Sequence, residues 1–377
     1  MLNGIKSNLI FKTIFQNMTK KNFLNILRYN KAYQKCLNLT IQYYATFYRE
    51  YQQIELDIIT EENFDSKKYK FMIIDPKDRN YFHCFFNDEQ EESQRLAREN
   101  ISKIKVKIDP ELKSLKGLFE SCFRLKEINF IKFHRKDISD LSNMFKMCID
   151  LTKLNITNLI TENVTNMSGM FANCLSLQNI ELSNFNTSKV TNMSHMFYFC
   201  KNLGEIDASK FDTSNVSNMN YMFYGCSSLK KLDLSNFDTS KVITFDRIFD
   251  RCEALEDLNI SNFNTSSIKK MNWIFNYCKS IKQLKLSSFN TTNVIDMSSM
   301  FNKCESLKEL DISNFNIKNV KDMNNMFDGC AALTKLNFGK LDFENDTNMK
   351  GMFNNCSDEL KKAIQKQYIN IKQEAFE

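Results

Sequence analysis

Apolar residues return along most of this chain with a fixed period of 26 residues, and each period contains one cysteine. Phe stands three positions before each of these ten cysteines, and Leu, Met, Ile or Phe stands four and seven positions before it. This spacing is the i, i+3, i+4, i+7 stripe of an amphipathic helix. It predicts a short helix that leads up to each cysteine. The cysteines are Cys122, Cys148, Cys174, Cys200, Cys226, Cys252, Cys278, Cys304, Cys330 and Cys356.

The residue eight positions before each cysteine marks the start of this predicted helix. It is Ser, Asp, Asn or Thr in nine of the ten units, and these residues are preferred at helix N-caps. After the cysteine, alternating apolar and polar residues such as Leu232-Asp233-Leu234 predict a short strand. A polar turn such as Asn186-Thr187-Ser188 follows the strand. Each unit is therefore predicted to contain a strand, a turn and a short helix.

A unit of this size is too small to hold a hydrophobic core alone, so a fixed period predicts a solenoid in which neighbouring units bury each other's apolar faces. The predicted fold class is α/β, with ten 26-residue strand-turn-short-helix units in residues 109–356 and their strands stacked into a parallel sheet. Residues 1–108 are predicted to form an α+β amino-terminal domain and cap. Residues 357–377 are predicted to form a capping helix that buries Leu360 and Ile364.

Within the amino-terminal domain the apolar spacing changes several times. It predicts two or three helices over residues 8–49 and strands over 54–59 and 101–108. Two runs rich in aromatic and β-branched residues predict a hairpin over 69–86, with a turn at Asp75-Pro76. The polar run 87–100 predicts a solvated helix.

The net charge of +6 is unevenly placed, because no Asp or Glu precedes Glu50 while eight Lys and Arg residues do. Such a segment fits nucleic acid, anionic lipid or an acidic partner, and the alternative is the solvated face of a helical domain. Only two prolines and eight glycines occur, so no flexible linker divides the chain. We find no secretory signal and no apolar run of membrane-spanning length, and an intracellular location is the expectation from the residues.

The repeated cysteines lie on the apolar stripe, which predicts buried free thiols rather than disulfides. No C-x-x-C pair occurs and the chain has three histidines, so we expect no metal site. The methionines at helical spacing predict core packing. The sequence contains no glycine-rich phosphate loop, no H-E-x-x-H and no nucleophile elbow, so we expect no cofactor and no enzymatic activity.

The consensus L-x-x-L-D-L-S-x-F-D-T-S-x-V-x-x-M-x-x-M-F-x-x-C, nearly complete in residues 177–200 and 229–252, resembles the BspA-like leucine-rich-repeat surface protein family. The resemblance covers about two thirds of the chain. It implies a leucine-rich-repeat solenoid and, as in surface-anchored members, adhesion to host or matrix proteins at the cell surface. The first helices also resemble an F-box, which implies the alternative of an intracellular adaptor that docks on a scaffold while its repeats bind a target.

Positions that vary between units are the candidates for recognition, since the repeated positions are committed to packing. Aromatic and cationic side chains gather in four central units at offsets that would share one flank. Trp, Tyr and Arg are the residues enriched at binding hot spots, so we predict a protein-binding site here. The alternative is that these rings pad the grooves between units. The residues are His195, Tyr198, Phe199, Tyr221, Tyr224, Arg247, Arg251, Trp273 and Tyr277.

A second candidate is a mildly acidic ribbon seven positions after the cysteines, for which the alternative is a solvated face. It includes Glu181, Asp207, Asp233 and Asp311. We expect a protein partner rather than nucleic acid, and a monomeric solenoid. Nucleic-acid binding would show itself by a steep loss of affinity with added salt.

Overall fold

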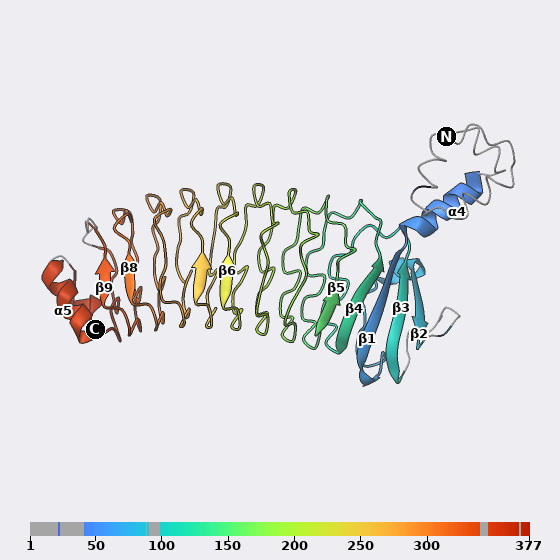
Figure 1. Ribbon diagram of the computed structural model, residues 1–377, viewed down its shortest axis with the longest axis horizontal. Helices are drawn as coiled ribbons and strands as arrows, with labels where there is room; N and C mark the ends of the chain where they lie inside the picture. Colours follow the sequence, from blue (N-terminus) through green and yellow to red (C-terminus); the bar gives the residue numbers. More distant parts are fainter. Residues whose placement is uncertain (1–21, 23–40, 88, 90–98, 340–345, 369–370) are drawn as a thin grey trace.

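The computed structural model describes residues 22, 41–87, 89, 99–339, 346–368 and 371–377. Coils of chain stack side by side into a long rod, with a β-sheet at the amino-terminal end and helix α5 at the other (Figure 1). The predicted repeat solenoid is confirmed. None of the helices in the described residues is long and apolar enough to cross a membrane.

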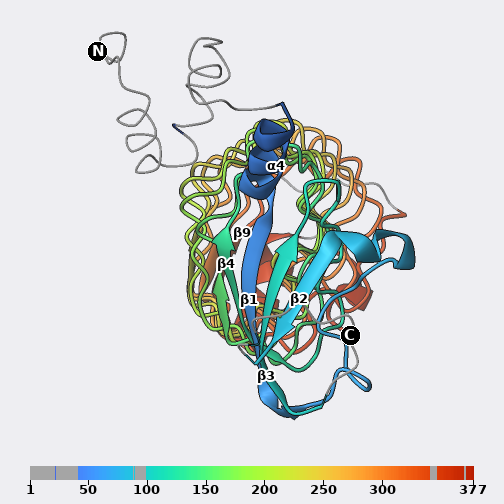
Figure 2. The same ribbon diagram turned by 90° about the vertical axis from the view of Figure 1, so that its right-hand side faces the viewer.

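The amino-terminal end is closed by a five-stranded sheet of order β2-β3-β1-β4-β5, which lies across the end of the rod (Figure 2). The strands at 54–59 and 101–108 are confirmed, and most of their apolar residues are buried while the residues between them are less buried. The sheet continues across the domain boundary predicted at residue 108, because β4 pairs with both β1 and β5. The elements are α4 (Ile41–Gln52), β1 (Ile54–Phe64), β2 (Phe82–Phe86), β3 (Ile101–Ile108), β4 (Leu125–Lys132) and β5 (Lys153–Asn155).

The hairpin predicted over 69–86 is wrong in its first half. Residues 69–74 form no strand, and β2 pairs with β3 instead. A 3-10 helix, η2 (Pro76–Tyr81), lies between residue 74 and β2. Its first turn is capped by the Asp75 side chain, which accepts a bond from the Lys77 amide. Pro76 pre-sets the backbone for this turn and cannot donate to a ladder. Helix α4 lies at the end of the region 8–49, where two or three helices are predicted. Apart from residue 22, the rest of that region and almost all of the helix predicted over 87–100 lie outside the described residues.

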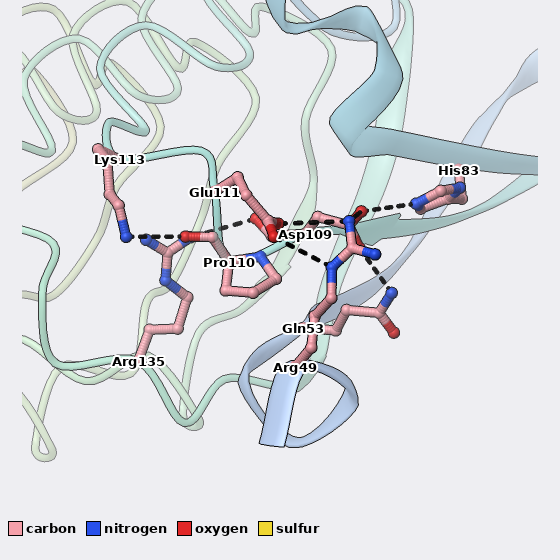
Figure 3. A network of polar contacts seen from close by, with 8 residues as sticks. All are labelled: Arg49, Gln53, His83, Asp109, Pro110, Glu111, Lys113 and Arg135. Atoms are coloured by element: carbon pink, nitrogen blue, oxygen red, sulfur yellow. Dashed lines mark hydrogen bonds and ion pairs between the residues drawn. The ribbon is translucent and has the colours of Figure 1, made fainter. Parts of the chain in front are cut away.

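A polar network joins α4, the sheet and the first coil (Figure 3). Asp109, at the end of β3, is buried. Its carboxylate accepts bonds from Arg49 Nη2 at 2.6 Å and Gln53 Nε2 at 2.7 Å, and His83 Nε2 lies 3.1 Å away. The fully buried Arg135 lies on the other side and pairs with Asp137 through two contacts of 2.9 Å. These partners fix α4 and β2 to the end of β3. Arg135 Nη1 donates to Asp109 O at 3.5 Å, which links the network to the first coil.

The strand part of each coil is only partly realised as a sheet. Three-residue strands pair in parallel as β6 (Lys231–Asp233) with β7 (Asp257–Asn259), and as β8 (Glu309–Asp311) with β9 (Lys335–Asn337). The described coils that contain Leu182, Ala208 and Leu286 have no assigned strand. The predicted continuous parallel sheet is therefore broken into short pieces.

The predicted short helix of each unit is wrong, because the residues before each cysteine form consecutive turns in the described coils. The residues five and one positions before the cysteine have positive φ, as with 57° at Asn143 and 61° at Met147, which no right-handed helix accepts. Alternate amides bond to the next coil, as Asn143 N does to Ser168 O at 2.8 Å, and the others bond three residues back, as Met144 N does to Leu141 O at 3.2 Å. The neighbouring coil thus satisfies amides that a helix would satisfy internally.

The apolar stripe nevertheless faces inward as predicted. Ten phenylalanines, one per unit from Phe119 to Phe353, stack with ring centroids 5.4–5.9 Å apart. Beside this stack the ten cysteines are all buried. From the second unit on, each thiol donates to the carbonyl of the phenylalanine in the preceding coil, as Cys200 Sγ does to Phe171 O at 3.0 Å. We call these two columns the Phe stack and the Cys ladder.

A helix follows the last described coil at the carboxyl-terminal end. Helix α5 (Asp358–Gln367) starts at Ser357, whose side chain accepts a bond from Leu360 N at 3.2 Å. Leu360 and Ile364 are buried as predicted. The chain then returns through η3 (Gln373–Ala375), and Phe376 stacks on Phe353 with centroids 5.4 Å apart, which extends the Phe stack into the cap.

Candidate partner-binding surface

Nine aromatic and cationic side chains lie on consecutive coils, five, two or one positions before the cysteine. The structure brings them together, and we call them the aromatic row. Arg251 is exposed and the other eight are half-buried. The members are His195, Tyr198, Phe199, Tyr221, Tyr224, Arg247, Arg251, Trp273 and Tyr277.

The backbone at seven of these nine residues has positive φ. At the position five before the cysteine, φ is 58° at His195, 57° at Tyr221, 51° at Arg247 and 57° at Trp273. For bulky residues this conformation is uncommon and costs about 1 kcal/mol or more each. The other six units place residues with smaller side chains here, namely Gly117, Asn143, Gly169, Ser299, Asn325 and Gly351. Four adjacent coils therefore hold large side chains at positions where the backbone favours glycine or asparagine.

The rings contact one another across the coils. His195 stacks on Tyr221 with centroids 4.8 Å apart, and Tyr198 stacks on Tyr224 at 5.0 Å. Further along, the Arg247 guanidinium lies 4.0 Å from the centroid of the Trp273 ring. Such stacked and cation–π pairs hold the rings in defined orientations.

Arg251 continues the contacts that begin with Tyr198 and Tyr224. Its Nε donates to the Tyr224 hydroxyl at 3.2 Å, and its guanidinium lies 4.9 Å from the centroid of the Tyr277 ring. Phe199 packs edge-to-face on Tyr224 at 5.1 Å. The interactions thus run through all four coils.

A buried carboxylate supports the centre of the row from below. Asp250 is completely buried and accepts bonds from Arg247 Nη1 at 2.9 Å and Asn276 Nδ2 at 2.8 Å. Burial raises the pKa of Asp250, while Asn276 and Arg247 oppose that rise. Because Arg247 is held at one end by Asp250, its other side is kept flat against Trp273.

The backbone hydrogen bonds between coils are interrupted between the coil of Arg247 and the coil of Trp273. Among the described coils from Asp140 to Asn348, parallel bridges join each pair of neighbours except Thr244 and Lys270. Among the described residues, the backbone amide of Arg247 makes no bond to a carbonyl of the next coil. The side-chain oxygens Asp246 Oδ1 and Asn272 Oδ1 are buried without a hydrogen-bond partner. Backbone strain and unpaired polar atoms therefore coincide at the coils of Arg247 and Trp273.

One glycine makes room for the row. Gly225 has φ of 72°, and a Cβ there would lie 2.8 Å from Cδ1 of Phe199. Gly329 occupies the same place in its unit with φ of 74°, but a Cβ there would meet only the flexible side chain of Lys303.

These two glycines give a matched test of the packing. Gly329→Ala should lower the free energy of unfolding by about 1–2 kcal/mol, the cost of the left-handed backbone. Gly225→Ala should lose about 1 kcal/mol more, because the Phe199 ring must move. Urea denaturation of both variants measures the difference, and equal losses would show that Phe199 is not held in place.

The acidic ribbon is exposed, and its carboxylates already accept hydrogen bonds from the backbone. Asp207 Oδ1 accepts from Ser209 N at 2.9 Å, and Asp233 and Asp311 accept from Ser235 N and Ser313 N at the same distance. Glu181 does likewise with Ser183 N. These bonds with Ser183, Ser209, Ser235 and Ser313 lower the pKa of the four carboxyl groups. Such Asx-type turns give the ribbon a local structural role in closing the coil.

Comparison with known proteins gives a family for the repeats. A family model described as "Mycoplasma protein of unknown function, DUF285" matches residues 113–206, 179–283 and 245–367. The chain belongs to the DUF285 family. In this DUF285 chain the three matched segments overlap and together cover the repeat array. No curated protein matches the chain.

Two solved structures share a looser likeness with this DUF285 chain. A leucine rich cell surface protein from Faecalibacterium prausnitzii A2-165 is 17% identical, with a TM-score of 0.25 over 60% of this chain and 75% of its own. TLR13 in complex with ssRNA13 is 14% identical, with a TM-score of 0.22 over 63% of this chain and 45% of its own. TM-scores this low give no information about what this chain binds.

Proposed function

We propose that this DUF285 chain is a non-catalytic recognition solenoid that binds a protein partner through the aromatic row. One observation carries the proposal: four adjacent coils hold His, Tyr, Arg and Trp at left-handed positions where the other coils have Gly, Asn or Ser. Strained backbone of this kind gathers at functional sites, because stability alone selects against it. Trp, Tyr and Arg are the residues that dominate binding energy at protein interfaces.

The repeat consensus supports a relationship to the BspA-like surface proteins. A protein of a host or matrix is then the expected class of partner. The alternative, an adaptor that docks through its first helices, depends on residues that lie almost wholly before Ile41, outside the described residues.

Replacing the rings by asparagine tests the proposal without adding backbone strain. Tyr221→Asn and Trp273→Asn introduce the residue that Asn143 and Asn325 provide at the same position elsewhere. Each variant should retain or slightly raise the denaturation midpoint, since asparagine tolerates positive φ. Each should weaken partner capture about tenfold or more, as expected for a hot-spot residue. Loss of function with no loss of stability separates recognition from packing.

The measurement is quantitative affinity capture from fractions of host cells and extracellular matrix, followed by mass spectrometry of the captured proteins. Ser299→Asn is the matched control, because it makes the same kind of change at the same position of the coil beyond Trp273. If the Tyr221 and Trp273 variants capture the same proteins in the same amounts as the control, the aromatic row is not the binding surface.

A further inference from the structure

The rings of the aromatic row turn their faces toward one another, which leaves their edges and polar tips for a partner. The planes of His195 and Tyr221 differ by 12°, as do those of Tyr198 and Tyr224. The Arg247 guanidinium covers Trp273 in the same manner. An aromatic ring is electrically negative on its face and positive at its edge. The exposed part of the row therefore favours negative groups, whereas bases of single-stranded nucleic acid need open ring faces on which to stack.

The unpaired charge on this surface is also positive. Arg251 and Lys201 are exposed, and neither forms an ion pair with any residue in the described part of the chain. Lys201 lies over the Phe199 ring, 5.4 Å from its centroid. Two nearby acids are already engaged, because Asp250 is buried against Arg247 and Glu253 pairs with Lys279 at 2.8 Å.

The length of the aromatic row indicates how long a bound segment would be. It crosses four coils, and neighbouring coils stacked in parallel are about 4.8 Å apart, so the row is about 14 Å long. An extended chain advances about 3.3 Å per residue and would cover this length with about five residues. The hydroxyl groups of the tyrosines and the Arg251 guanidinium offer hydrogen-bond donors along that path.

We propose that the aromatic row selects an extended acidic protein segment of about five residues, with carboxylates that meet the guanidinium of Arg251. The inference rests on the proposed function and gives the chemistry of the partner. Carboxylates satisfy the donors of Arg251 and the positive ring edges together. Because Arg251 is solvent-exposed, it contributes to specificity and to the rate of association more than to a large binding energy.

Fluorescence anisotropy with a labelled octaglutamate peptide tests the proposal on the whole 377-residue chain at low ionic strength. Octaglutamate should bind more tightly than labelled octalysine and labelled oligo-dT of eight nucleotides. Arg251→Gln should weaken octaglutamate binding by about fivefold, the upper range for an exposed charge pair. Lys303→Gln is the matched control, since Lys303 has the same place in its unit and φ of 59°, compared with 62° at Arg251. The control should change binding less than twofold.

Three results would overturn the inference. They are no binding of octaglutamate, equal losses in the Arg251 and Lys303 variants, and tighter binding of oligo-dT than of octaglutamate. The last would assign the surface to single-stranded nucleic acid. These outcomes are distinct from failure of the proposed function: if the asparagine variants lose their captured proteins but octaglutamate does not bind, recognition stands and only the acidic preference falls.

Discussion

Raising the pH above 9 is expected to destabilise this protein steeply, because the Cys ladder must stay protonated inside the core. An unfolded cysteine ionises near its ordinary pKa of 9.0, whereas burial raises the pKa of Cys122 and Cys200 to about 12. Burial raises the pKa of the other ladder cysteines too, and that of the less buried Cys356 rises to about 11. At pH values between 9 and 12, unfolding releases a proton from a buried cysteine. Stability is therefore intact below pH 9 and is lost as the pH rises toward 12. Each cysteine contributes a slope of about 1.4 kcal/mol per pH unit.

A single substitution isolates this slope. Cys200→Ala removes one titrating thiol, so its free energy of unfolding should fall less steeply with pH than that of the wild type, by about 1.4 kcal/mol per unit between pH 9 and 11. Urea denaturation at several pH values in the presence of a reductant measures it. Leu203→Ala, a buried change in the same unit, should lower stability equally at every pH. Parallel pH profiles for Cys200→Ala and the wild type would contradict the assignment of a buried protonated thiol.

Removing one ring from the middle of the Phe stack is expected to cost about 3–5 kcal/mol. Phe223 is completely buried and lies between Phe197 and Phe249, with centroid distances of 5.7 and 5.9 Å. Phe223→Ala leaves a cavity that its neighbours cannot fill, because each is fixed by the next coil. In a solenoid the loss is local to adjacent coils, so the central coils should open first.

Hydrogen exchange and denaturant unfolding together check this expectation. Phe223→Leu is the control, since it keeps most of the volume and should cost less than about 1.5 kcal/mol. Exchange in Phe223→Ala should accelerate most at coils that contain Phe197 and Phe249. Uniform acceleration over the whole rod would instead mean that the array unfolds as a single cooperative unit.

The burial pattern of the units was predictable because it depends on which residues face inward. Positions seven, four and three before the cysteine, and the cysteine itself, are buried whether the backbone is a helix or a run of turns. Leu141, Met144, Phe145 and Cys148 illustrate this, since all are buried in a coil that contains no helix. The periodicity of apolar residues therefore predicted the core correctly and the secondary structure wrongly.

A signal for the true backbone was present in the sequence. Gly117, Gly169 and Gly351 stand five positions before their cysteines, and Gly225 and Gly329 stand one position before theirs. Glycine weakens a helix interior but is the residue of choice where φ is positive. Reading these glycines together would have predicted turns in place of helices. It would also have shown that the aromatic row occupies strained positions.

The candidate site was predictable only as a set of residues. Its members were found from their aromatic and cationic character and their spacing, and the structure brings them together. Their contacts were not predictable, because Arg247 could have paired with several acids. Asp250, which holds Arg247 against Trp273 from beneath, was not among the predicted residues at all. Its role depends on burial, and a carboxylate two positions before a cysteine shows no such property in the sequence.

The sequence alone determined that this protein is a solenoid of 26-residue units with a seam of Phe and Cys, because only stacked neighbours can bury so short a repeat. The tertiary structure decided the backbone conformation within each unit. Half of the amides before each cysteine bond to the next coil, and bonds between residues 26 or so apart leave no local mark on the sequence. For the same reason, only the stacked coils decided that the rings of the aromatic row face one another.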